Sequence, residues 1–170
     1  MNAPLLTEPS IPVQATRSQP APGWLRDLMT VRAHYEERFG WPVTVQVAER
    51  RLAIGLGKVL DAVTMPAVLG ALVHAQLGIA MLAGPVIGHT DGGRWTFLTQ
   101  PVAPSNANVM ASLVEQDVRY AGAGSFTVIP ASEADMGWRW IAEPRPNQML
   151  PSPFAVAATV RRVCAATPAA

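Results

Sequence analysis

The chain has 170 residues, of which 49% are hydrophobic and only 15% are charged, and its formal net charge is +1. This length supports one domain with its own core, and the composition excludes a mainly disordered chain. The balanced charge excludes a strong overall attraction to nucleic acid or acidic lipid, while a local basic face stays open. The single cysteine, Cys164, excludes an intrachain disulfide and a cysteine-based zinc cluster, so we expect a cytoplasmic protein.

The two ends of the chain differ from its middle. Residues 1–22 hold five prolines without an apolar period, which predicts a flexible arm. We expect one domain over residues 23–165 and a disordered tail over 166–170. The opening residues lack a basic segment followed by a continuous apolar run, so we expect no secretion signal.

Helical and strand periods follow each other after the arm. Helical spacing predicts a first helix that ends at Gly40, with an apolar face made of Trp24, Leu25, Leu28, Val31, Tyr35 and Phe39. Alternating apolar residues then predict two strands, WPVTVQV and RLAIGLG, separated by a charged turn.

An uncharged run extends from Ala62 to Ile87 and is long enough to span a bilayer. Prolines, glycines and polar residues divide it, so we expect a buried helix followed by a strand and no membrane contact. Pro66 suits the first turn of that helix. Its predicted apolar face ends at Gly78 and comprises Val68, Leu69, Leu72, Val73 and Leu77.

The second half of the chain predicts strands joined by tight turns. GPVIG and RWTFLT flank HTDGG, and DVRY and SFTVIP flank AGAG, which predicts two hairpins. A weaker helix is expected over residues 105–115, WRWI is a short strand, and a last helix follows Ser152 and Pro153. The sequence thus predicts a single α+β domain with a mainly antiparallel sheet of two hairpins flanked by helices.

Conventional catalytic motifs are not evident in this sequence. No serine lies in a G-x-S-x-G context, and the glycine-rich GLGK and AGAG segments fit neither a P-loop nor a dinucleotide fingerprint. The three histidines, His34, His74 and His89, lack metal-ligand spacing, so we interpret them as structural.

One group of charged residues lies at predicted strand ends. Asp61 follows a predicted strand, Arg94 and Trp95 begin the second strand of the first predicted hairpin, and Asp117 and Arg119 begin the strand after it. If these ends converge, two carboxylates would hold Mg²⁺ or Mn²⁺ and the arginines would bind nucleotide phosphates. The alternative is ordinary solvated ion pairs.

The order of four segments resembles the primase-polymerase (prim-pol) domain of the archaeo-eukaryotic primase superfamily, in particular its divergent copies in actinobacteria. The segments are GKVLDAVTMPAVLG, LAGPVIGHTDGGRWTFLTQP, VEQDVRYAGAGSFTVIPAS and WRWI, within roughly residues 51–141. The family has a pair of acids near a strand end, a histidine that contacts the nucleotide, and an aspartate before a glycine-rich hairpin. The resemblance implies a prim-pol-like fold.

Carried over residue by residue, the resemblance implies an incomplete active site. Asp61 falls on the first acid and Asp117 on the third-motif acid, whereas Thr64 and Trp95 stand where the second acid and the histidine are expected. Two acids allow one weakly held Mg²⁺ or Mn²⁺, not the pair of ions that phosphoryl transfer uses. We therefore expect a degenerate, non-polymerising domain that binds a nucleotide, single-stranded DNA or a protein partner.

Two alternatives stay open. The first is an active metal-dependent nucleotidyltransferase that uses Asp61 and Asp117 with Glu115 or Glu133 as a substitute ligand. The second is a protein-interaction or regulatory module.

The two tryptophans of WRWI bear on both binding hypotheses. Trp138 and Trp140 share one face of this strand and Arg139 points the other way. If exposed, this face would bind a nucleic-acid strand or a protein; if buried, it belongs to the core.

Overall fold

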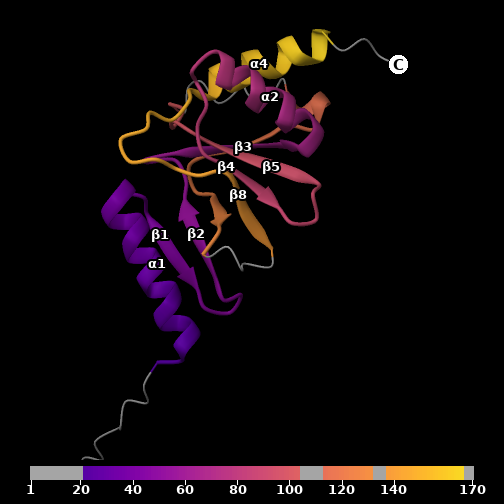
Figure 1. The fold of residues 1–170 in the computed structure, drawn as a ribbon. Helices are drawn as coiled ribbons and strands as arrows, with labels where there is room; N and C mark the ends of the chain where they lie inside the picture. The colour runs from indigo at the N-terminus through magenta and orange to yellow at the C-terminus, as the bar shows by residue number, and fades with distance from the viewer. Residues whose placement is uncertain (1–20, 104–112, 132–136, 167–170) are drawn as a thin grey trace, which may run out of the picture.

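The computed structural model describes residues 21–103, 113–131 and 137–166 (Figure 1). Within these ranges the helices are α1 (Gly23–Phe39), α2 (Ala67–Ile79) and α4 (Pro153–Ala166), with a short 3₁₀ helix, η2 (Val114–Gln116). Most of the predicted arm, of the predicted tail and of the helix expected over residues 105–115 lies outside the described residues.

The lower part of the molecule in Figure 1 is a three-stranded antiparallel sheet with α1 against one face. The strand order is β1-β2-β7, with bounds Val43–Gln46, Arg51–Gly55 and Phe126–Ile129. Tyr35 of α1 shares a core with alternate residues of these strands. Gly40 ends α1 with a φ of 65°, as the sequence predicts.

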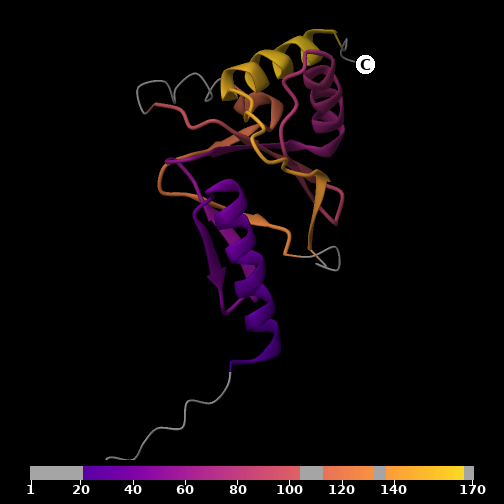
Figure 2. The same ribbon diagram turned by 60° about the vertical axis from the view of Figure 1, so that its left-hand side comes forward.

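The upper part is a five-stranded antiparallel sheet in the order β6-β3-β5-β4-β8. The bounds are Arg119–Ala121, Asp61–Pro66, Arg94–Thr99, Val86–His89 and Trp138–Ala142. Helix α2 connects β3 to β4, and α2 and α4 lie together on the upper face (Figures 1 and 2). Strands β3 and β4, which α2 connects, have β5 between them and so form a split β-α-β unit. Strand β6 lies on the other side of β3.

Strand β3 contributes to two cores because its side chains alternate between the faces of the sheet. Val63 and Met65 point up into a core with α2 and α4, which we call the upper core. Ala62 points down into a core shared with α1 and the three-stranded sheet, which we call the lower core. The five-stranded sheet is therefore the middle layer of three.

The α+β class and the antiparallel pairing are confirmed, and so is the β4–β5 hairpin. The second predicted hairpin is wrong, because β6 pairs with β3 whereas β7 pairs with β2. A turn does form between them, where the Ser125 N–H donates to the Gly122 carbonyl at 3.0 Å. This turn carries the chain from one sheet to the other, so the structure has two sheets where one was expected.

Two boundaries around β3 also differ from expectation. Asp61 follows β2 as expected but itself begins β3, a strand that the sequence did not predict, and Pro66 ends β3 as the N-cap of α2. On α2, Leu77 is buried as expected, whereas Val68 and Leu72 are 80% and 47% exposed. The uncharged sequence of this helix gives no polar face from which its buried side could be identified.

The long uncharged run of the sequence is divided among β3, α2 and the beginning of β4. Among the helices of the described ranges, none combines the length and the apolar character that crossing a bilayer requires.

At Gly57 the segment after β2 lies very close to the turn between β6 and β7. Gly57 has a φ of 102°, and a Cβ atom there would lie 2.3 Å from the Cα atom of Ala123. We predict that Gly57→Ala lowers the free energy of unfolding by about 3 kcal/mol or more, because backbone strain adds to steric overlap. Denaturant titration measures this change.

Gly124 provides the matched control. Its φ is 83°, but a Cβ atom there would meet nothing within 4 Å. Gly124→Ala should therefore cost only backbone strain, about 1 kcal/mol. Equal losses in the two variants would contradict the close approach of Gly57 to Ala123.

Candidate functional site

Asp61 is fully buried at the beginning of β3. Its Oδ2 atom accepts hydrogen bonds from the Tyr120 hydroxyl at 2.5 Å and from the Val102 N–H at 2.7 Å. The Oδ1 atom is also buried and has no hydrogen-bond partner among the described residues. Asp61 lies on the same face of β3 as Val63, so it points toward the upper core. The carboxylate therefore ties β3 to β6 and to the segment after β5.

Asp117 occupies a different environment, immediately before β6. It ends η2 with a φ of 53°, and its side chain is 53% exposed. Arg94 donates from Nη1 to the Asp117 carboxylate at 2.5 Å and from Nη2 to the Asp117 carbonyl at 2.7 Å. Arg119 lies at the edge of this pair, with its Nη2 atom 3.6 Å from Asp117 Oδ1.

The expected convergence of charged residues is confirmed for Arg94, Asp117 and Arg119, and wrong for Asp61. Asp61 pairs with Thr99 at one end of β3, whereas Arg94 pairs with Pro66 at the other. Five residue steps of about 3.3 Å separate these ends by about 17 Å. Asp61 and Asp117 therefore cannot ligate one cation together.

The carboxylates of the described residues do not fit the Mg²⁺ or Mn²⁺ that the prim-pol resemblance implies. One candidate, Asp61, is buried away from Asp117, which is already paired with Arg94. Across the described ranges, no group of three or more His, Cys, Asp or Glu side chains can hold an ion. Of the substitute ligands, Glu133 and the side chain of Glu115 lie outside the described residues.

Thr64 points down, away from Asp61, because the two residues are three apart on one strand. Its hydroxyl lies 2.9 Å from the hydroxyl of Thr96 on β5. Arg94 lies beside this pair and donates from Nη2 to the Thr64 carbonyl at 3.5 Å. Two neutral hydroxyls thus occupy the lower face of the sheet next to the arginine.

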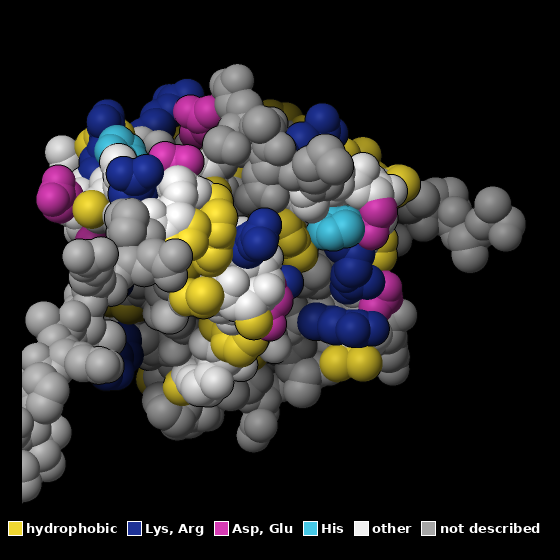
Figure 3. Space-filling view, turned by 90° about the horizontal axis from the view of Figure 1, so that it is seen from below, with side chains coloured by type: hydrophobic (Ala, Val, Ile, Leu, Met, Phe, Trp, Pro, Cys, Tyr) yellow, Lys and Arg dark blue, Asp and Glu magenta, His cyan; other side chains and the backbone are white. Residues whose placement is uncertain are grey.

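These residues line a hollow of about 380 Å³ between the two sheets, which we call the inter-sheet cleft. It is lined from the five-stranded sheet and its β4–β5 turn by Thr64, His89, Asp91, Arg94, Thr96 and Trp138, and from β7 by Phe126, Thr127 and Val128. Seen from below, basic and acidic side chains lie beside a histidine at the right of the view (Figure 3).

The wall at the β4–β5 turn is held by side-chain contacts. His89 lies edge-on to Trp138 with ring centroids 4.6 Å apart, and its Nδ1 atom is 2.8 Å from Asp91 Oδ2. The hydrogen bond from the Gly93 N–H stabilises the charged form of Asp91 and lowers the pKa of that carboxyl, and the hydrogen bond with His89 adds a smaller effect in the same direction. Asp91 therefore stays ionised and holds the imidazole against the indole.

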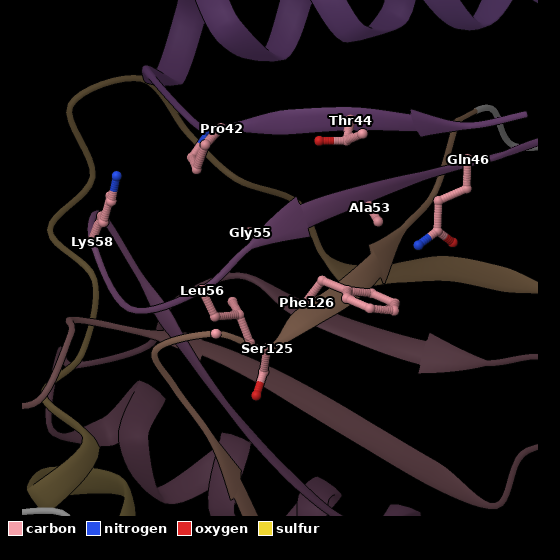
Figure 4. A pocket seen from close by; sticks show the side chains of 10 residues that line it. Pro42, Thr44, Gln46, Ala53, Gly55, Leu56, Lys58, Ser125 and Phe126 are labelled. Carbon is pink, nitrogen blue, oxygen red and sulfur yellow. The ribbon is translucent and has the colours of Figure 1, made fainter.

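A second hollow of about 450 Å³ lies on the face of the three-stranded sheet opposite α1. We call it the sheet groove; it is lined by Pro42, Thr44, Gln46, Ala53, Gly55, Leu56, Lys58, Gly124, Ser125 and Phe126 (Figure 4). Phe126 is 59% exposed and lines both the groove and the cleft. Its ring therefore forms the boundary between the two hollows.

Searches of protein-family models, of curated proteins and of solved structures find no match to this chain. The chemistry of the two hollows is therefore the basis for assigning a function.

The predicted aromatic residues are distributed over three places. Trp138 lines the inter-sheet cleft. Trp140 packs against the lower core and donates from Nε1 to the Tyr35 hydroxyl at 3.0 Å, so it does not lie in the cleft. Trp95 is also absent from the cleft, because it points to the helix side and packs beside Gly70 and His74.

Phe126 and Lys58 are lining residues that the sequence analysis did not identify. The strand that contains Phe126 was assigned to a hairpin with β6, which placed it in the wrong sheet. Lys58 lies in a turn with no motif around it. The alternation in SFTV does place Phe126 and Val128 on one face, but it does not indicate that this face is open.

The hydrogen bond between Tyr120 and the buried Asp61 predicts a specific pH dependence. Burial, with the hydrogen bond to Asp61 and its negative charge, raises the pKa of Tyr120 above its usual value, and burial likewise raises the pKa of Tyr35. Unfolded tyrosine ionises near pH 10. The two raised tyrosine pKa values therefore stabilise the folded state fully below about pH 10, and this stabilisation is lost as pH rises toward the folded pKa values.

We predict that the free energy of unfolding falls above about pH 10, and that tyrosinate absorbance in the native protein appears only well above that pH. Tyr120→Phe should lower stability at neutral pH by about 1–3 kcal/mol, because Asp61 loses a donor, and should weaken the alkaline decline. Tyr35→Phe is the control that keeps the Asp61 contact. Ionisation of Tyr120 near pH 10 in the native protein would contradict this contact.

Proposed function

We propose that this protein is a non-catalytic, prim-pol-like binding module that holds a phosphate-bearing base ligand, a nucleotide or a single strand of nucleic acid, in the inter-sheet cleft. The observation that carries the proposal is that Arg94 and Phe126 line one open hollow, with Arg119 beside Arg94 at their shared partner Asp117. Guanidinium groups bind phosphate through forked hydrogen bonds, and an exposed aromatic ring stacks on a base.

The two arginines have different roles in this proposal. Arg94 is fixed by two hydrogen bonds to Asp117 and is 31% exposed, so it contributes a positive field at a defined position. Arg119 is 75% exposed and only loosely paired with Asp117 at 3.6 Å. Its donors are therefore available to a phosphate that binds beside Arg94 and Asp117.

Phe126 supplies the apolar part of the site. Large apolar side chains are normally buried, and this ring is exposed between two hollows whose lining includes small residues such as Ala53 and Gly55. A flat base has room to lie against the ring there. Stacking of this kind contributes about 1–3 kcal/mol per base and tolerates any sequence.

The two adjoining hollows favour a strand over a single nucleotide. Lys58 lines the sheet groove beyond Phe126, and Arg51 donates to Gln46 at the groove's other end at 2.6 Å. Cationic side chains are therefore present beside both hollows. A strand that crosses Phe126 would contact both sets, whereas a mononucleotide would occupy one hollow.

The geometry gives no support to the nucleotidyltransferase alternative. Two-metal phosphoryl transfer needs carboxylates around one pair of ions, and Asp61 and Asp117 lie at opposite ends of β3. Thr64 brings a neutral hydroxyl to the cleft. The residues of the cleft bind and orient; they contain no pair of acids placed to activate a nucleophile.

We predict that a labelled single-stranded oligonucleotide binds this protein and that affinity falls as salt increases. Arg119→Ala and Phe126→Ala should each weaken binding about tenfold, because a charge-assisted hydrogen bond or a stacking contact is lost. Fluorescence anisotropy titration, repeated with mononucleotides as competitors, measures these changes.

Two control variants each remove a side chain of the same type, an arginine or a phenylalanine, at a position away from the cleft. Arg162 is exposed on α4, and Phe154 is 38% exposed at the beginning of that helix. Arg162→Ala and Phe154→Ala should change affinity by less than about twofold, since neither lines the inter-sheet cleft or the sheet groove. The absence of binding to any oligonucleotide or nucleotide, or equal losses in cleft and control variants, would contradict the proposal.

Divalent cations provide a further test. We predict that removing Mg²⁺ and Mn²⁺ with a chelator leaves oligonucleotide affinity unchanged at constant ionic strength, because arginines and an aromatic ring form the site. Primer extension should not occur with either ion. Extension that is lost in Asp117→Ala would instead support the nucleotidyltransferase.

A further inference from the structure

The outer face of α2 is apolar and exposed. Val68 is 80%, Leu72 47% and Ile79 77% exposed, and Met81 and Leu82, just after the helix, are 92% and 47% exposed. Helix α2 lies at the outside of the molecule in both ribbon views (Figures 1 and 2). A contiguous apolar surface of this kind on a folded protein marks an interaction site.

The exposed residues are regularly placed along the helix. Val68, Leu72, Ala75 and Ile79 are spaced four, three and four residues apart, which is the spacing of a helix-pairing seam. At about 100° per residue they fall within an arc of about 60°. The buried residues Val73 and Leu77 lie on the opposite side of the helix and pack into the upper core, so the four exposed residues are not needed for that packing.

The lack of charge on this face favours a second copy of the chain over a charged partner. No Asp, Glu, Lys or Arg occurs from Ala62 to Ile87, so the face offers nothing for a charged partner to pair with. In a two-fold symmetric interface, residues near the axis meet their own copies, and any charge there would face its like. An uncharged helix avoids this cost and matches a second copy of itself.

We propose that α2 is the interface of a two-fold symmetric homodimer in which the two α2 helices pack antiparallel. In this arrangement Val68 lies opposite Ile79 of the second copy, and Leu72 lies opposite Ala75, so large and small side chains alternate across the axis. The inter-sheet cleft lies on the other face of the five-stranded sheet. Dimerisation therefore leaves both clefts open and does not depend on the proposed ligand.

Charge substitution tests the interface and its direction. Val68→Glu and Ile79→Lys each place an unpaired charge opposite an apolar residue in their own homodimers. Each variant alone should therefore dissociate, with the dimer dissociation constant rising at least about tenfold. In a mixture of the two variants, the new carboxylate at position 68 faces the new ammonium at position 79, so a heterodimer should form.

Sedimentation velocity over a concentration series measures these states. Both positions are more than three-quarters exposed, and circular dichroism checks that each variant stays folded. Val47→Glu, at a residue 57% exposed in the turn between β1 and β2, is the matched control and should remain dimeric. A wild-type monomer at every concentration, dimers that survive both single substitutions, or a mixture that stays monomeric would overturn the proposal.

Discussion

The two-residue alternation of β3 is the constraint on which the rest of this structure depends. Strand β3 is an inner strand of the five-stranded sheet, with β5 on one side and β6 on the other. Its alternation sends Asp61 up to Tyr120 and Thr64 down to Thr96. Because Asp61 and Thr64 are an odd number of residues apart, they lie on opposite faces of the sheet. The Asp61 carboxylate is therefore a buried hydrogen-bond acceptor, and the Thr64 hydroxyl faces the cleft. We therefore propose binding by arginine and aromatic chemistry, because Asp61 lies on the opposite face of β3 from the cleft and Asp117 is paired with Arg94.

The middle sheet also separates two surfaces with opposite character. Its lower face and β7 enclose a hollow with the Arg94 guanidinium group, an imidazole and an exposed phenyl ring. Its upper face is covered by α2 and α4, and the outer side of α2 is free of charge. A ligand that carries phosphate suits the first surface and a second copy of the chain suits the other. The two interactions can coexist because β3 and its neighbours lie between them.

Local sequence patterns predicted the parts of the fold that are decided locally. The first helix and its stop at Gly40 follow from apolar spacing and a left-handed glycine, and the β4–β5 hairpin follows from Asp91 and Gly92 in its turn. The AGAG turn is equally local, but tertiary pairing sends its two strands into different sheets. The depth of Asp61 could not be predicted either, because it depends on Tyr120, 59 residues away. For the same reason Arg94, Asp117 and Arg119 were correctly grouped, whereas Phe126 was missed.

The central claim is that the ligand lies between the two sheets, and mapping backbone amide chemical shifts during an oligonucleotide titration tests it most directly. The predicted result is a continuous set of shifted amides along β7 and the beginning of β5, around Phe126 and Arg94, with α2 and α4 unaffected. Shifts confined to the helices, or none at saturating oligonucleotide, would contradict it.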